Sequence, residues 1–75
     1  MNLDDRHFLR ALGDRIRELR TARKLTQADL ANACRLHRTF IGSVERGERN
    51  LAILNLRRIA KVLRVSSADL LGNVR

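Results

Sequence analysis

Several residue types that many proteins rely on are missing or rare in this sequence. It has no proline, tryptophan or tyrosine, and two phenylalanines are its only aromatic residues. This composition excludes collagen-like, proline-rich and other low-complexity classes. The one cysteine, Cys34, excludes a disulfide scaffold; a single thiol either fits a reducing compartment or carries no information on the compartment. We expect Cys34 to lie in the core, because no second cysteine or cluster of ligand residues indicates a metal site.

Long apolar segments and export signals are also missing. The longest aliphatic run covers residues 51–54, far short of the roughly 20 apolar residues that a membrane-spanning helix needs. The chain starts with acidic residues, Asp4 and Asp5, where a secretory signal would be basic. We therefore expect a cytoplasmic protein without a membrane partner.

No arrangement typical of an enzyme stands out either. The sequence has no Ser-His-Asp set, no phosphate-binding glycine loop and no paired carboxylates with catalytic spacing. We expect a protein that is not an enzyme and that needs no cofactor, metal or small-molecule ligand.

The strongest feature of the composition is positive charge. Sixteen lysines and arginines outnumber eight acidic residues, which gives a net charge of +8 and a pI near 11.6. Fourteen of the sixteen are arginine, whose guanidinium can bind phosphate or guanine through two hydrogen bonds. A small, strongly basic domain usually binds a polyanion, so we expect nucleic acid as the partner. With 75 residues the chain should form one domain, 1–75, which pairing with a second copy would stabilise.

Hydrophobic periodicity predicts an all-α protein. A first helix is expected over about 5–23, capped by Asp4 or Asp5, with an apolar stripe formed by Phe8, Leu12, Ile16 and Leu19. Further helices are expected over about 27–34, 37–46 and 52–64, and a last one from Ser66 to Gly72. Their ends are marked by residues suited to caps, namely Thr26 with Asp29, Gly47, and Ser66 with Asp69. Five helices with short connections predict a compact helical bundle.

Residues 27–46 have the pattern of a helix-turn-helix unit. A small residue, Ala31, stands where the two helices must approach closely. Apolar residues can face inward before, within and after the turn: Leu30, Cys34, Leu36, Ile41 and Val44. Polar residues of the second helix are expected to face outward: His37, Arg38, Thr39 and Ser43.

These residues resemble a known family. The segment LTQADLA at 25–31 and the residues from Ile41 to Gly47 are similar to the helix-turn-helix regulators of the XRE type, which include small phage repressors and Cro-like proteins. The resemblance extends over about residues 10–72. Within the family, HRTFI at 37–41 and ERGERNL at 45–51 are most similar to the controller proteins of restriction–modification systems. The family often has glycine where this chain has Arg35, so either Arg35 carries a modest backbone cost or the turn differs slightly. The Arg35 side chain is also a candidate phosphate contact.

The resemblance implies a lambda-repressor-like fold that binds a palindromic site on double-stranded DNA as a homodimer, with the helix at about 37–46 in the major groove. We expect base contacts from Arg38, Thr39 and Ser43. Contacts to the DNA backbone are expected from Gln27, His37, Arg46, Arg49 and Asn50. His37 is alternatively the N-cap of this helix, and Phe40 either packs partly into the core or contacts DNA. The resemblance also implies a structural ion pair between Arg20 and Glu45.

The dimer interface is expected in the C-terminal part of the chain, where apolar residues exceed the needs of a short helix. Its expected members are Val65, Leu70, Leu71 and Val74. Leu51 and Leu54 form the alternative patch. A different class of function also stays open, in which the same fold binds a protein, as an antitoxin or a coactivator adaptor does.

Overall fold

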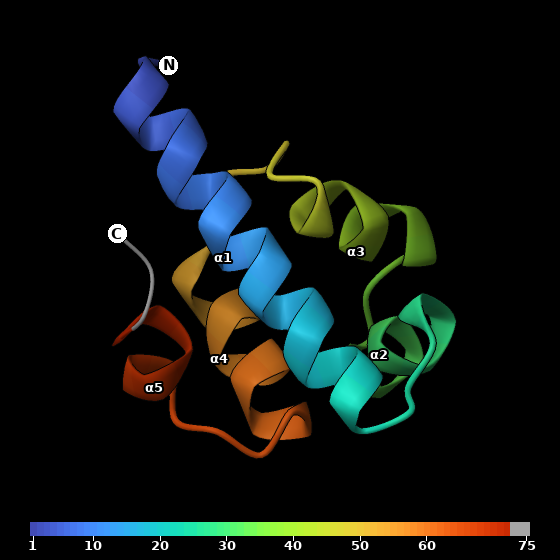
Figure 1. Ribbon diagram of the computed structural model, residues 1–75. Helices are drawn as coiled ribbons and strands as arrows, with labels where there is room; N and C mark the ends of the chain where they lie inside the picture. The colour runs from blue at the N-terminus through green and yellow to red at the C-terminus, as the bar shows by residue number, and fades with distance from the viewer. Residues whose placement is uncertain (73–75) are drawn as a thin grey trace.

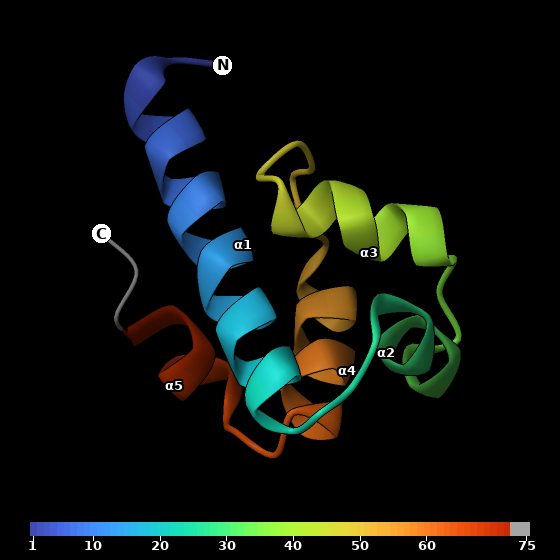
Figure 2. The same ribbon diagram turned by 45° about the vertical axis from the view of Figure 1, so that its right-hand side comes forward.

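The computed structural model describes residues 1–72, which form five α-helices and no strand. These helices are α1 (Leu3–Ala22), α2 (Gln27–Cys34), α3 (Arg38–Glu45), α4 (Ile53–Val62) and α5 (Ser67–Gly72). The long helix α1 packs against α3 and α5, and α2 contacts both α3 and α4. In Figures 1 and 2 the first turns of α1 project beyond the other helices. The all-α fold predicted from the sequence is therefore confirmed, and no helix within residues 1–72 is long and apolar enough to cross a membrane.

Side-chain caps define where most of the helices begin. The hydroxyl of Thr26 accepts a hydrogen bond from the Asp29 amide at 3.0 Å, and the Asp29 carboxylate accepts one from the Thr26 amide at 2.8 Å. This reciprocal capping box starts α2, and its hydrogen bonds from Thr26 lower the pKa of Asp29. At α5, Ser66 Oγ accepts a hydrogen bond from the Asp69 amide at 2.9 Å. These two predicted caps are confirmed.

The start of α1 differs from the prediction. Asn2 is its N-cap and accepts a hydrogen bond from the Asp5 amide at 2.8 Å, so the helix begins at Leu3. Asp4 and Asp5 lie in the first turn instead, where their negative charge favours the positive end of the helix dipole. Expecting Asp4 or Asp5 as the cap was wrong because asparagine caps a helix equally well.

The chain leaves four of its helices through a residue in the left-handed backbone region. Gly47 has a φ of 76° after α3, as expected for a glycine at this position. Non-glycine residues adopt the same region after the other three helices, with φ of 58° at Lys24, 58° at Arg35 and 60° at Arg64. Arg35 therefore takes the conformation that the family often gives to glycine, which costs about 1 kcal/mol or more.

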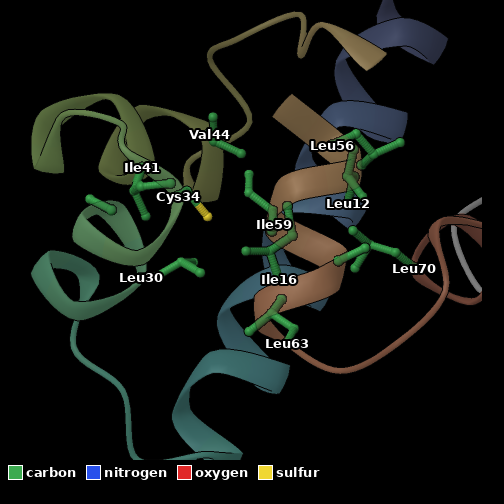
Figure 3. Close-up of a cluster of buried hydrophobic side chains, with 12 residues drawn as sticks. Leu12, Ile16, Leu30, Cys34, Ile41, Val44, Leu56, Ile59, Leu63 and Leu70 are labelled. Carbon is green, nitrogen blue, oxygen red and sulfur yellow. The ribbon is translucent and has the colours of Figure 1, made fainter. Parts of the chain in front are cut away.

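The core lies between α1, α4 and the α2–α3 pair (Figure 3). It is built from fully or nearly fully buried side chains, among them Leu12, Ile16, Leu30, Cys34, Ile41, Val44, Leu56, Ile59, Leu63 and Leu70. Cys34 is a core residue as predicted, and burial raises the pKa of its thiol although Arg58 lowers it somewhat. The stripe predicted for α1 is wrong at its first position, because Phe8 is 37% exposed and the core begins at Leu12.

Two glycines allow α3 to end directly on α1. A Cβ atom at Gly13 would lie 2.5 Å from the carbonyl oxygens of Val44 and Glu45. A Cβ atom at Gly47 would lie 2.7 Å from the Cα atom of Arg10. Both distances are shorter than real Cβ contacts, so only glycine lets the two backbones meet here. The C-terminal end of α3 is thereby fixed against the middle of α1.

Candidate nucleic-acid interface

The first turn of α3 presents two exposed polar side chains. Arg38 and Thr39 are exposed, and His37 caps the helix in front of them. The Nδ1 atom of His37 accepts a hydrogen bond from the Thr39 amide at 3.3 Å and lies 2.8 Å from Thr39 Oγ1. Of the two alternatives for His37, the structure contains the N-cap, while the exposed ring leaves room for a phosphate as well. Arg38 and Thr39 have the position from which a helix-turn-helix reaches base edges.

Ser43 does not face outward, which corrects the orientation expected from the sequence. It is only 7% exposed, and its hydroxyl donates a hydrogen bond to the Phe40 carbonyl at 2.7 Å. The same hydroxyl accepts a hydrogen bond from Arg49 Nε at 3.2 Å. Five consecutive residues of α3, from Ile41 to Glu45, are buried, because the helix packs against α1 and α2 at the same time.

Arg49 folds back over α3 instead of extending into solvent. Its guanidinium lies 5.6 Å from the centroid of the Phe40 ring, a distance at which a cation attracts an aromatic face. Phe40 itself is half-buried and packs against the core, as the first of its two expected roles required. Arg49, Phe40 and Ser43 thus form one small cluster on the surface of α3, and Arg49 keeps free donors for a phosphate.

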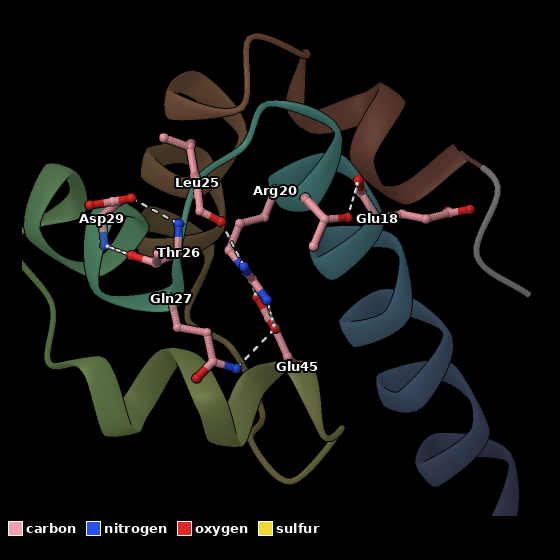
Figure 4. A network of polar contacts seen from close by, with 8 residues as sticks. Glu18, Arg20, Leu25, Thr26, Gln27, Asp29 and Glu45 are labelled. Atoms are coloured by element: carbon pink, nitrogen blue, oxygen red, sulfur yellow. Dashed lines mark hydrogen bonds and ion pairs between the residues drawn. The ribbon is translucent and has the colours of Figure 1, made fainter.

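A buried ion pair holds the other end of α3. Arg20 Nε lies 2.6 Å from Glu45 Oε2, and Arg20 Nη2 lies 3.0 Å from Glu45 Oε1, so the pair is bidentate (Figure 4). Arg20 Nη1 also donates to the Leu25 carbonyl at 2.7 Å. Arg20 and Glu45 are 8% and 5% exposed, and the hydrogen bond to Glu45 raises the pKa of Arg20. The pair expected between these two residues is therefore present and ties α3 and the α1–α2 connection to α1.

Gln27 joins this network, which the sequence did not indicate. Its Nε2 atom donates a hydrogen bond to Glu45 Oε1 at 3.1 Å (Figure 4). Gln27 is the first residue of α2 and remains half-exposed. Its contact with Glu45 fixes the start of α2 next to α3, where free backbone amides of a helix start can bind phosphate. The sequence around position 27 does not indicate whether the Gln27 side chain contacts Glu45 or solvent.

The residues after α3 carry further positive charge on the surface. Arg46 and Asn50 are exposed, and Arg46 Nε lies 3.1 Å from Glu48 Oε2. This hydrogen-bonded pair lowers the pKa of Glu48 and raises that of Arg46. Because both side chains are mostly exposed, the pair can open when a stronger anion approaches Arg46.

The surface of α3 thus combines exposed hydrogen-bonding groups with a fixed support. An exposed helix start, a helix-capping histidine and several arginines lie on or beside α3, supported from behind by a buried ion pair. Within residues 1–72, no group of three or more His, Cys, Asp and Glu side chains is placed to hold a metal ion.

Comparison with known proteins identifies the family. The helix-turn-helix family model matches residues 16–70. The control protein C.BamHI of Bacillus amyloliquefaciens is 42% identical over 60 residues, 79% of this chain and 74% of that protein. The control protein C.SmaI of Serratia marcescens is 45% identical over 60 residues, 80% and 71% of the two chains.

A solved structure agrees with these sequence relatives. The restriction-modification controller protein C.AhdI from Aeromonas hydrophila superposes with a TM-score of 0.80 and 42% identity, over 83% of this chain and 94% of that one. The resemblance to controller proteins indicated by the sequence is thereby confirmed, and this chain belongs to the helix-turn-helix family.

Proposed function

We propose that this protein is a transcription regulator that binds a palindromic site on double-stranded DNA as a two-fold homodimer. The observation that carries the proposal is the pair of exposed side chains, Arg38 and Thr39, at the start of a helix whose other end is locked in place. The control proteins C.BamHI and C.SmaI are among its relatives, which supports a role in a restriction–modification system. A regulator of this kind acts in the compartment that holds the DNA, the cytoplasm, and needs no catalytic step.

Base readout falls to the start of α3 in this proposal. Arg38 can bind O6 and N7 of a guanine through two hydrogen bonds, and Thr39 can offer a hydroxyl group or a methyl group to a thymine. Ser43 supports this surface indirectly, because it is buried and holds Arg49. The first turn of α3 therefore supplies the sequence preference of each half-site.

Backbone contacts surround this central pair. Gln27 and the free amides at the start of α2 would hold one phosphate, and His37 another. Arg46, Arg49 and Asn50 follow α3 and would lie along the backbone of the same half-site. These contacts position the protein on DNA and carry no sequence information of their own.

The homodimer is proposed to use the exposed apolar start of α4. Ile53 is 69% exposed and Leu54 is 60% exposed, which is unusual for large aliphatic side chains in so small a protein. Leu70 is fully buried in the core of its own subunit and cannot be shared with a partner, so its expected place in the interface is corrected. Val65 and Leu71 are half-buried, and Val74 lies outside the described residues. The alternative patch around Leu54 is therefore the better supported interface.

Selection of binding sites from random DNA tests the function. We expect enrichment of a palindrome whose half-sites lie one helical turn, roughly 34–36 Å, apart. With three or four phosphate contacts per subunit, the log–log salt dependence of the affinity should have a slope of about −5 to −7. Enrichment of no sequence, together with tight binding of a protein from the same locus, would instead support the interaction-module function.

Sedimentation equilibrium tests the dimer. Leu54→Asp should give a monomer at concentrations where the wild type is a dimer, because the carboxylate would have to be buried at the interface. Leu71→Asp is the matched variant for the C-terminal patch and should remain a dimer. A dimer for Leu54→Asp together with a monomer for Leu71→Asp would instead place the interface at α5.

A further inference from the structure

A groove separates the projecting turns of α1 from the turn that follows α3. Its volume is about 490 Å³, and it is lined by Arg6, His7 and Arg10 on one side and by Arg46 and Glu48 on the other. Residues 6, 7 and 10 share one face of α1, because they recur at three- and four-residue spacing. Figures 1 and 2 both show the first turns of α1 rising past this turn.

The two walls of the groove are fixed relative to each other. Gly47 lies so close to the backbone of Arg10 that a Cβ atom there would be 2.7 Å from Arg10 Cα. Gly13, one turn further along α1, makes the same kind of approach to the end of α3. A rigid groove can hold its charged side chains at a constant spacing without a large loss of entropy on binding.

The carboxylates that line the groove do not neutralise its positive charge. Arg6 and Arg10 are exposed and have no ion-pair partner among residues 1–72. Glu48 is the one carboxylate that lines the groove, and it is already paired with Arg46. The groove therefore carries two uncompensated arginines beside a third that a stronger anion can recruit.

The groove is continuous with the surface proposed to face DNA. A Cβ atom at Gly42 in α3 would lie 3.2 Å from Arg46 Nη1 and 3.5 Å from Gln27 Oε1. The Arg46 side chain thus lies near Gly42 and the start of α2, and Arg46 also lines the groove. An anion in the groove would be a close neighbour of the phosphates proposed for residues 46–50.

We propose that this groove binds one additional phosphate of the DNA backbone in each half-site, held between Arg6 and Arg10 on α1 and Arg46 after α3. The proposal rests on the proposed function and assigns a DNA contact to the part of α1 that the core does not use. Its occupant is a backbone phosphate because the lining offers several guanidinium donors, which match phosphate oxygens. The first turns of α1 then extend the footprint without reading sequence.

The test compares two double variants that remove the same charge. Arg6→Gln/Arg10→Gln removes the groove arginines, and Arg57→Gln/Lys61→Gln removes two exposed cations at the same spacing on α4. Affinity for the selected palindrome is measured from 50 to about 300 mM salt, with thermal melting to show that both variants fold. Losing one phosphate contact per subunit should flatten the log–log slope by about 2 for the groove variant, while the α4 variant keeps the wild-type slope.

Ethylation interference on the same DNA locates the contact. In the wild type, one phosphate per half-site beside those contacted by residues 46–50 should be sensitive, and this sensitivity should vanish in Arg6→Gln/Arg10→Gln. If the slope and the interference pattern of the groove variant match those of the α4 variant, the groove proposal is overturned while the proposed function stands. If the wild type prefers no DNA sequence at all, both are overturned.

Discussion

The two ends of α3 are built in opposite ways. At the N-terminal end, Arg38 and Thr39 are exposed and only the side chain of His37 covers the backbone. At the C-terminal end, Glu45 is buried and bound to Arg20 and Gln27, while the following turn rests on α1 through Gly47. One end has free hydrogen-bonding groups and the other has almost none.

In the proposed function, this difference separates base recognition from structural support within the eight residues of α3. Base readout requires side chains that are accessible before DNA arrives and that start from a backbone held in one orientation. The buried ion pair and the two glycine contacts supply that orientation from the far end of the helix. Changes at the C-terminal end should therefore act on folding, and changes at the N-terminal end should act on DNA specificity.

The largest effect is expected from breaking the ion pair. Arg20→Ala or Glu45→Ala leaves a buried charge without its partner, which costs about 3–5 kcal/mol. Thermal or urea unfolding measures this loss, and for a chain of this size 1 kcal/mol corresponds to about 4–8 °C in Tm. Glu48→Ala is the control, because it removes an exposed partner of Arg46 and should leave Tm almost unchanged.

A double variant tests the same ion pair without leaving a buried charge unpaired. Arg20→Met/Glu45→Leu removes both charges at once and should recover part of the stability lost in either single variant, since no buried charge remains. If both single variants melt like the wild type, the C-terminal end of α3 is not held by this pair and the proposed division between the two ends fails.

The next effect is expected from closing the contact between α3 and α1. Gly13→Ala places a methyl group where Val44 and Glu45 already have carbonyl oxygens, and the resulting displacement should cost about 1–3 kcal/mol. Gly72→Ala is the matched control, because a Cβ atom there meets nothing within 4 Å. Equal melting temperatures for the two variants would contradict the close approach of α3 to α1.

At the other end of α3 the expected effect is on binding alone. Arg38→Ala should weaken binding to the best site by about 1–3 kcal/mol and relax the preference at one base pair per half-site. Its melting temperature should stay that of the wild type, because Arg38 is exposed. Gln27→Ala should weaken binding to all sequences alike, and it also removes a hydrogen bond to Glu45 at the C-terminal end of α3, so its Tm should fall slightly. An equal loss on specific and random DNA for Arg38→Ala would make Arg38 a phosphate ligand instead.

Local chemistry made the ends of most elements predictable from the sequence. Thr26 with Asp29, Ser66 with Asp69, and Gly47 each combine a residue type with a spacing that has few other uses. The ion pair of Arg20 and Glu45 was expected from the family resemblance, since 25 residues separate the partners and no local pattern joins them.

Tertiary packing decided what the sequence could not. Ser43 was expected outside because a helix usually exposes one face, yet α3 is short and is covered by α1 and α2 together. Phe8 extends a perfect helical stripe, but it lies before the first core residue of α1, Leu12, and its side chain stays 37% exposed. Leu70 was assigned to a dimer because a single sequence does not distinguish a residue that fills its own core from one that fills a partner's.

The smallest effect is expected in the turn that leads into α3. Arg35 has a φ of 58°, and the turn after α3 reaches the same region with Gly47 at 76°. Arg35→Gly should relieve the left-handed strain of about 1 kcal/mol or more, while the freer unfolded chain takes back part of the gain, which leaves about 0.5 kcal/mol of added stability. Arg23→Gly is the control: Arg23 ends α1 at a φ of −92°, so glycine there relieves no strain and should lower Tm. DNA binding by Arg35→Gly tests whether the Arg35 side chain also contacts a phosphate. A more stable protein with weaker binding to all sequences would mean that it does, despite its backbone cost. A lower Tm for Arg35→Gly would instead show that the N-terminal end of α3 is entered without strain.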